Sequence, residues 1–418
     1  MQGMIGRITA FWIMLAAIAT GGGGIAHGQE FSALARLDAA RSGIASPDGR
    51  RLEMALQLSQ AVPWRVFTLD GPRRLVLEFR EVDWGDAAAS TLLKGDPAPV
   101  RDLRFGRIVP GWSRLVLELG APLGIESAGM KTDSTTGEAR VEIALEPVTP
   151  EAFAAHAGAP QAAGWEALPP PAKVAPAVRR QDGTRPLLVV LDPGHGGIDP
   201  GAERAGLKEA DLALAFARRL KEALLRHGGF DVLLTRDDDY FVPLAERLSI
   251  ARAAGADVFI SLHADALEEG NARGATIYTL SQEASDEASQ RLAESHDRAD
   301  LLAGVDLSGQ DDEIALVLMD LARRDTQPRS EALAQALVQA LKGGVGRLYK
   351  HPHQSASFSV LKAADIPSVL IELGFLSSEE DRANLASPEW QEKAARAIVA
   401  ALDAWAREDA AQAGLLRR

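Results

Sequence analysis

The sequence predicts two folded domains of different classes: a small all-β, sandwich-like domain, then an α/β domain whose mostly parallel, twisted sheet is flanked by helices. Three observations support this fold class. The 418 residues suffice for two domains, each with its own core. Short apolar or alternating segments separated by turns fill residues 33–148. Beyond residue 185, apolar strand-like segments alternate with amphipathic helical segments, which is typical of a parallel sheet covered by helices.

Residues 1–28 have the composition of a secretory signal peptide. Arg7 precedes an apolar stretch from Ile8 to Thr20, and small residues follow it. This stretch is shorter than a transmembrane helix requires, so we expect export with cleavage near Gly28. No later segment looks able to span a membrane. The mature chain is therefore expected to lack a transmembrane segment and to be soluble in a bacterial periplasm.

Composition limits the kinds of partner and site. The formal net charge of -13 at pH 7 argues against nucleic acid as a partner, because phosphate binding requires basic patches. The chain has no cysteine. Its stability therefore has to come from its cores, and any metal site has to use histidine and carboxylate ligands.

The predicted β-domain, residues 33–148, contains a loose internal repeat. Its strand-like segments are residues 51–59, 73–79, 113–130 and 139–147. The second pair of segments repeats the pattern of the first, which predicts two related halves with Pro63 and Pro122 at matching bends. The domain has no histidine or Gly-rich loop, so we expect a binding module. The following Ala- and Pro-rich residues, 149–185, are expected to form a semi-stiff linker.

The predicted α/β domain covers residues 186–408. Its expected strands are residues 187–192, 230–236, 256–265, 274–280 and 366–374, and its expected helices are residues 209–228, 244–255 and 390–405. A long insertion at about residues 282–342 separates the last two strands. Most of the insertion has helical periodicity, with helices expected at residues 282–304 and 311–341.

Four polar residues lie near the ends of these strands. His195 follows the first strand within the segment LDPGHGGIDPG (191–201), Glu209 begins the next helix, His263 ends the third strand, and Glu372 ends the last strand. In parallel sheets, ligands bind beyond the carboxyl ends of the strands. Two histidines and a carboxylate form a common catalytic zinc set with one open position, and a further carboxylate can act as general base.

Each of these residues also has a simpler interpretation. A histidine at a strand end is often an ordinary surface residue, and Glu209 alone could be a carboxylate favoured by the helix dipole. Glu372 is harder to explain in this way, because it lies among apolar residues where an unpaired carboxylate is costly. The glycines around His195 fit a metal site, since they let the backbone turn sharply and leave room for a bulky substrate.

Four motifs between residues 186 and 405 resemble a known enzyme family. They are LDPGHGGIDPGA, GLKEADLALAFARRL, FISLHADA and FSVLKAADIPSVLIELGFLSS, and they look like the zinc-dependent N-acetylmuramoyl-L-alanine amidases that separate daughter cells in Gram-negative bacteria. In the β-domain, PWRVFTLDGPRRLVLEF and RFGRIVPGWSRLVLEL are similar to the AMIN domain that precedes these amidases.

The resemblance implies a ligand set and a reaction. His195, Glu209 and His263 would bind one Zn²⁺ per chain, and Glu372 would be the catalytic glutamate. The implied reaction is hydrolysis of the peptidoglycan amide between N-acetylmuramic acid and L-alanine of the stem peptide, in cell-wall remodelling and daughter-cell separation. The AMIN-like domain, residues 33–148, is expected to bind peptidoglycan and to localise the enzyme.

Two other functions stay open at this point. One is an inert wall-binding protein with an amidase-like domain, although inactive relatives usually lose a ligand or the base and none is missing here. The other is a zinc peptidase that acts on peptide cross-links. The identity of the products would separate both from an amidase.

Three further polar residues have less specific interpretations. Asp265, two residues after His263, is expected to orient that histidine, to contact substrate, or simply to cap its loop. His351 and His353 are expected on a surface loop, with substrate contact as the alternative.

The insertion resembles a regulatory element of the same family. In relatives that act at division, a helix of this insertion covers the zinc, and an acidic side chain occupies the open position until an activator with a LytM-type domain displaces it. The segment AESHDRADLLAGVDL (293–307) is similar to that element. The resemblance therefore implies a LytM-domain protein as a partner.

His296 and Glu294 are the candidates for the residue that blocks the zinc. His296 stands where the acidic residue is expected. At helical spacing it shares the apolar face with Leu292, whereas Glu294 lies nearly opposite. A neutral imidazole is a good zinc ligand and could displace the water. The alternative is that His296 only packs under the helix.

Overall fold

The computed structural model describes residues 35–80, 82–95, 97–109, 111–133, 135–160, 180–267, 272–303 and 315–416. The predicted signal peptide and most of the predicted linker, residues 161–179, lie outside these ranges. Residues 33–418 cluster into one compact unit. Within the described ranges, no helix is both long enough and apolar enough to cross a membrane.

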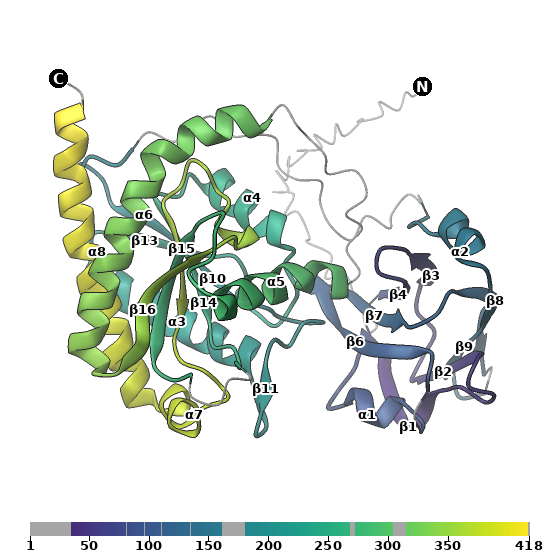
Figure 1. The fold of residues 1–418 in the computed structure, drawn as a ribbon. Coiled ribbons are helices and arrows are strands. Elements are labelled where there is room, and N and C mark those ends of the chain that lie inside the picture. The colour runs from purple at the N-terminus through teal and green to yellow at the C-terminus, as the bar shows by residue number, and fades with distance from the viewer. Residues whose placement is uncertain are drawn as a thin grey trace, which may run out of the picture. The chain divides into compact units, whose positions relative to one another are not determined.

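Residues 35–160 form the predicted β-sandwich (Figure 1). One sheet has the strand order β5-β1-β2-β9-β8 and the other has the order β3-β4-β7-β6. Buried residues of both sheets, such as Leu56 and Leu77, share one core. The elements are β1 (Ala35–Ala45), β2 (Leu52–Leu58), β3 (Trp64–Leu69), β4 (Arg74–Arg80), β5 (Val82–Asp83), α1 (Ala89–Leu92), β6 (Val100–Val109), β7 (Trp112–Leu119), β8 (Leu123–Thr132), β9 (Ala139–Pro147) and α2 (Pro150–His156).

The two prolines of the repeat lie at matching bends, as expected. Pro63 precedes β3 and Pro122 precedes β8, and at both points the chain passes from one sheet to the other. Helix α2 was not expected, because its residues were assigned to the linker. Thr149 caps it by accepting a hydrogen bond from the Ala152 amide at 3.2 Å. Phe153 is buried in the sandwich core, so this part of the assigned linker is folded.

The second part of the chain has a six-stranded sheet in the order β13-β10-β14-β17-β15-β16. All neighbouring strands are parallel except β15 and β17, so the expectation of a mostly parallel sheet is confirmed. The elements are β10 (Leu187–Pro193), β11 (Glu203–Arg204), β12 (Leu207–Lys208), α3 (Glu209–His227), β13 (Phe230–Leu234), α4 (Leu244–Ala254), β14 (Val258–His263), β15 (Ala275–Leu280), α5 (Glu287–Leu302), α6 (Ala315–Val345), β16 (Leu348–Ala356), the 3-10 helix η1 (Ser359–Leu361), β17 (Ser368–Glu372), α7 (Glu379–Ala386) and α8 (Pro388–Leu416).

Helices cover both faces of this sheet (Figure 1). On β10, Val189 packs toward α3, α6 and α8, whereas Val190 packs toward α4, α5 and η1. A strand that is apolar on both faces gives the continuous apolar run seen in its sequence. The insertion forms α5 and α6, which confirms the two expected helices.

Strand β16 was missed, and the expectation that His351 and His353 lie on a surface loop is wrong. Both residues belong to this edge strand, which pairs in parallel with β15. His353 Nε2 lies 3.1 Å from Thr279 Oγ1 and 3.3 Å from a carboxylate oxygen of Glu331. The strand was missed because a half-exposed edge strand lacks an apolar pattern. Pro352 is tolerated in it because backbone amides on the outer side of an edge strand need no partner.

Candidate metal centre

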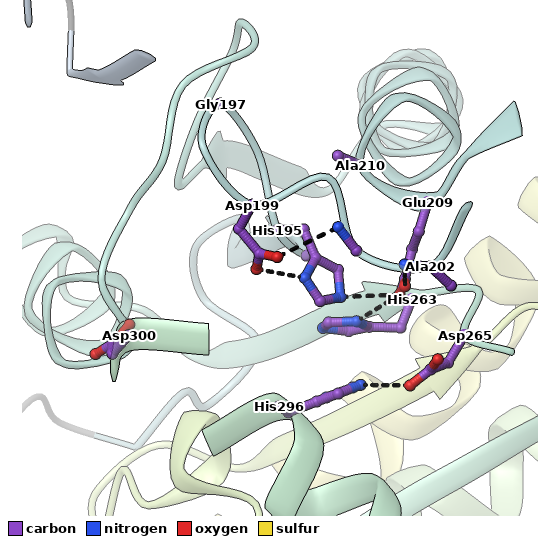
Figure 2. A network of polar contacts seen from close by, with 12 residues as sticks. His195, Gly197, Asp199, Ala202, Glu209, Ala210, His263, Asp265, His296 and Asp300 are labelled. Carbon is purple, nitrogen blue, oxygen red and sulfur yellow. Dashed lines mark hydrogen bonds and ion pairs between the residues drawn. The ribbon is translucent and has the colours of Figure 1, made fainter. Parts of the chain in front are cut away.

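The sheet brings the predicted site residues to one edge. Strands β10, β14 and β17 are parallel neighbours, so their carboxyl ends meet. His263 and Glu372 are the last residues of β14 and β17 and stand directly opposite one another in the register. His195 lies just beyond β10, and Glu209 is the first residue of α3. Figure 2 shows the imidazoles of His195 and His263 converging on the Glu209 carboxylate.

Close approach of the ligands depends on glycine. A Cβ at Gly194 would overlap the imidazole of His263, and one at Gly201 would lie 2.7 Å from Glu209 Oε2. His195 itself has a φ of 57°, in the left-handed region that residues other than glycine rarely adopt. The Gly-rich segment thus makes the expected sharp turn, and at Gly194 and Gly201 the space that glycine leaves is occupied by His263 and Glu209.

Glu209 connects the two histidines. Its Oε1 atom lies 3.2 Å from His195 Nε2 and 2.9 Å from His263 Nδ1. Backbone amides of Ala202 and Ala264 donate to the same carboxylate at 2.9 and 3.1 Å. The carboxylate is completely buried, and these contacts fix its position.

The chemistry of this group fits a metal ion. His195, Glu209, His263 and His296 each offer one ligand atom, and these atoms lie within 4.8 Å of one another. In the described part of the chain, His195 Nε2 and Glu372 Oε1 are among the buried side-chain atoms that make no hydrogen bond; the 3.2 Å contact of His195 Nε2 with Glu209 Oε1 does not have hydrogen-bond geometry. Buried polar atoms are rarely left in this state unless something else binds them. Imidazole nitrogens with a carboxylate oxygen are typical zinc ligands.

Helix α5 brings His296, and not Glu294, to this centre. The His296 ring stacks on that of His263 with a centroid distance of 4.2 Å, and its Nε2 lies 3.3 Å from Asp265 Oδ2. Glu294 is not part of the ligand group: it is exposed, its Oε1 accepts a hydrogen bond from Gln290 of the same helix at 2.9 Å, and it lines the adjoining cleft. The structure therefore agrees with the helical-spacing argument. The Asp265 side chain faces His296. Nothing in the sequence around Asp265 predicted this contact.

Two aspartates of α5 fasten the helix to neighbouring elements. Asp300 accepts hydrogen bonds from the Leu244 amide at the start of α4, at 3.0 and 3.2 Å. Asp297 accepts one from the Ser359 amide at the start of η1, at 2.9 Å. Such contacts satisfy amides at helix starts that have no partner within their own helix. Sequence reasoning missed both roles, because acidic residues are also ordinary on an exposed helix.

Further residues missed by the sequence analysis support the His195 segment. Asp199 Oδ2 lies 2.6 Å from His195 Nδ1 (Figure 2). Behind it, the buried Arg247 Nη1 donates to Asp192 at 2.7 Å, and Arg247 Nη2 donates to the His195 carbonyl at 2.9 Å. The signal for Asp199 was its place in the Gly-rich segment, four residues after the histidine.

Electrostatics distinguish the two buried glutamates. Burial, together with the nearby charges of Glu209 and Asp265, raises the pKa of Glu372 well above its usual range. Burial also opposes ionisation of Glu209, but the adjacent His195 and His263 hold its pKa well below the usual range. Burial and the neighbouring His296 lower the pKa of His263 to about 4. One glutamate is therefore suited to be an anionic ligand and the other to exchange a proton.

The centre opens onto a cleft of about 540 Å³. His195, Glu209 and Asp265 lie in its wall. Four arginines also line it: Arg104, Arg204, Arg291 and Arg298. Acidic side chains such as Asp199, Glu203 and Glu294 line it as well, so the cleft presents charges of both signs next to the candidate metal ligands.

Comparisons with known proteins show what the whole chain is similar to. The family described as N-acetylmuramoyl-L-alanine amidase matches residues 189–404. The N-acetylmuramoyl-L-alanine amidase AmiC of Neisseria meningitidis serogroup B is 32% identical over 383 residues, which cover 84% of this chain and 86% of that protein. AmiC of Escherichia coli O6:H1 is 29% identical over 367 residues, which cover 86% and 87%. The solved structure of the amidase AmiC2 of Nostoc punctiforme aligns with a TM-score of 0.38 and 28% identity, over 52% of this chain and 96% of that one.

Proposed function

Because the chain belongs to the N-acetylmuramoyl-L-alanine amidase family and thus cleaves the peptidoglycan amide between N-acetylmuramic acid and L-alanine, we propose that it does so with one zinc ion per chain. His195, Glu209 and His263 would hold the ion, and Glu372 would be the general base. The observation that carries this proposal is the convergence of these side chains at one sheet edge, with two buried polar atoms that have no hydrogen-bond partner.

The two oxygens of Glu372 have different roles in this proposal. Oε2 accepts a hydrogen bond from the Asp265 amide at 3.0 Å, which fixes the carboxylate. Oε1 has no such partner and is free to accept a proton from the attacking water and to return it to the leaving amine. The raised pKa of Glu372 favours the proton-carrying state that links these two transfers. When bound, zinc supplies Lewis-acid polarisation of the scissile carbonyl and makes water more acidic.

The test of this proposal is digestion of purified peptidoglycan sacculi with and without a chelator. The zinc-loaded chain is expected to release free stem peptides and to leave glycan strands without peptides, as mass spectrometry would detect. Removal of the metal should reduce the rate to background, because the proposed reaction depends on the bound ion. Added Zn²⁺ should restore the rate.

Two results would contradict the proposal. Products cut only within the peptide cross-links would identify a peptidase instead. A chelated chain that remains fully active would exclude a metal-dependent reaction.

We further propose that His296 restrains the enzyme as a fourth ligand. It lies within the four-residue ligand group, its side chain is buried, and it belongs to the helix fastened by Asp297 and Asp300. In that position it would exclude substrate and water from the ion. An activator, which we take to be a LytM-domain protein, would have to move α5 away.

Replacing His296 with Ala is expected to raise basal activity on sacculi by about tenfold, equivalent to about 1.4 kcal/mol. The increase should be partial, because Asp297 and Asp300 still hold the helix. Initial rates without activator measure the effect. Glu294→Ala, at an exposed residue of the same helix that lines the cleft, tests the alternative assignment and should not raise the rate. The opposite pattern, with only Glu294→Ala faster, would assign the block to Glu294.

Three further proposals concern the location of the enzyme, its biological role and the function of its N-terminal domain. We propose that the chain acts in the periplasm, after removal of residues 1–28, in cell-wall remodelling and daughter-cell separation. We also propose that residues 33–148 bind peptidoglycan and localise the enzyme, as their similarity to AMIN domains suggests. A domain without catalytic residues that binds wall material would raise the local concentration of the enzyme at its substrate.

A further inference from the structure

The edge strand β6 of the β-sandwich packs directly against the His195 segment. The Arg107 carbonyl accepts hydrogen bonds from the amides of Ile198 and Phe241, at 3.2 and 3.1 Å. A Cβ at Gly106 would lie only 2.5 Å from the backbone of Gly197 and Ile198. Any side chain at position 106 would therefore overlap the opposite backbone. The two segments can approach this closely only because residue 106 is glycine.

A shared apolar cluster surrounds this backbone contact. Ile108, Trp112 and Val116 of the sandwich are buried together with Ile198 and Phe241 of the second part of the chain. Buried Arg114 of β7 adds a polar link, because its Nη1 donates to the Ala303 carbonyl just beyond α5 at 2.8 Å. Apolar side chains from both parts of the chain are buried in this contact, which is typical of a specific interface between domains.

Arg104 of β6 extends the contact to the metal centre itself. Its Nη1 donates to Asp199 Oδ1 at 2.8 Å, while its Nε donates to Asp102 at 2.9 Å. The other oxygen of Asp199 lies 2.6 Å from His195 Nδ1. The Asp199 side chain is 3% exposed and that of Arg104 is 26% exposed, so solvent screens this pair only partly.

We propose that Arg104 is a positioning residue for the metal ligand His195, and that the N-terminal β-domain is thereby a structural part of the metal centre. Arg104 fixes the orientation of the Asp199 carboxylate, which in turn fixes the tautomer and ring orientation of His195 so that Nε2 faces the other ligands. This inference rests on the proposed zinc site. It adds a role to a domain for which the sequence suggested only binding.

The physical basis is the hydrogen bond on the second nitrogen of a ligating imidazole. Groups that orient a ligating histidine in this way typically change metal affinity by about 10–100-fold when removed. Without Arg104, Asp199 would lose its charged partner and gain rotational freedom, and His195 would lose a fixed orientation. The loss should therefore appear in zinc affinity, not only in catalytic rate.

The experiment measures the zinc dissociation constant of the full chain by competition with a chromophoric chelator. Arg104→Ala is expected to weaken zinc binding by about tenfold. Arg104→Lys should recover part of this loss, since it keeps the charge but not the planar geometry. Arg107→Ala is the matched control, because its side chain pairs with Asp238 at the same contact, is 42% exposed, and is not part of the metal-ligand group.

A second background separates positioning from loss of the domain contact. In an Asp199→Asn chain, which lacks the charged partner, Arg104→Ala should weaken zinc binding little further. An equal loss in both backgrounds, or an equal loss in Arg107→Ala, would mean that the variant disturbs only the packing between the domains. Melting temperatures of all variants monitor that packing.

The remaining outcomes discriminate between the hypotheses. Unchanged zinc affinity in Arg104→Ala, with a higher KM, would overturn the inference and assign Arg104 to substrate binding in the cleft. A wild-type chain that binds no zinc would overturn the proposed zinc site first, and this inference with it. Weaker zinc binding only in Arg104→Ala and Asp199→Asn supports it.

Discussion

Glu372→Gln is expected to lower turnover on peptidoglycan by about 10²–10⁴-fold while the chain keeps its zinc, since that is the usual contribution of a positioned general base. Glutamine has nearly the same shape and retains an oxygen that can accept the hydrogen bond from the Asp265 amide. It cannot take a proton from water at the position of Oε1. The metal ligands His195, Glu209 and His263 are unaltered, so metal content should remain near one zinc per chain.

The measurement combines stem-peptide release with metal analysis of the same protein sample. Glu380→Gln is a suitable control, because Glu380 is an exposed carboxylate that pairs with Arg347 away from the centre. It should match the wild-type rate. A Glu372→Gln chain that digests sacculi at the normal rate would disprove the role assigned to Glu372.

His263→Ala is expected to remove both zinc and activity. The imidazole is buried and supplies one of the ligand atoms of the proposed zinc site. Binding of a structural or catalytic metal depends on the full ligand set, so the metal content should fall from about one zinc per chain to background. The zinc-free chain should also lose about 1–3 kcal/mol of stability, because buried Glu209 Oε1 loses a partner.

His227→Ala provides the comparison for this variant. His227 ends α3 and is exposed, and its Nδ1 lies 3.1 Å from the Gly228 carbonyl. Its replacement should change neither the metal content nor the rate. Retention of stoichiometric zinc by His263→Ala would mean that the ion binds elsewhere, even if activity were lost.

Sequence alone identified the residues that converge at the sheet edge because their positions follow from local patterns. His195, His263 and Glu372 each follow a run of β-branched or apolar residues, and adjacent parallel strands bring such ends together. The orientation of α5 was also predictable, since helical spacing places His296 and Glu294 on different faces. Periodicity of this kind requires no knowledge of distant contacts.

Other features depend on contacts that no local pattern records. Strand β16 is half exposed at a sheet edge, so its residues lack apolar alternation. The direction of β15 relative to β17 is set by the connecting chain, not by the strand's own sequence. Arg104 and Asp199 are 95 residues apart, and each is an ordinary charged residue in its local context.

The contact between Gly106 and Gly197 has a consequence for how such chains can be recombined. Exchange of the N-terminal domain between relatives would separate two positions that must both remain without a side chain. A donor domain with any larger residue at position 106 would place its Cβ 2.5 Å from the Gly197 backbone. Chimeras for engineering therefore need to carry β6 and the His195 segment from the same parent, or to keep glycine at both positions.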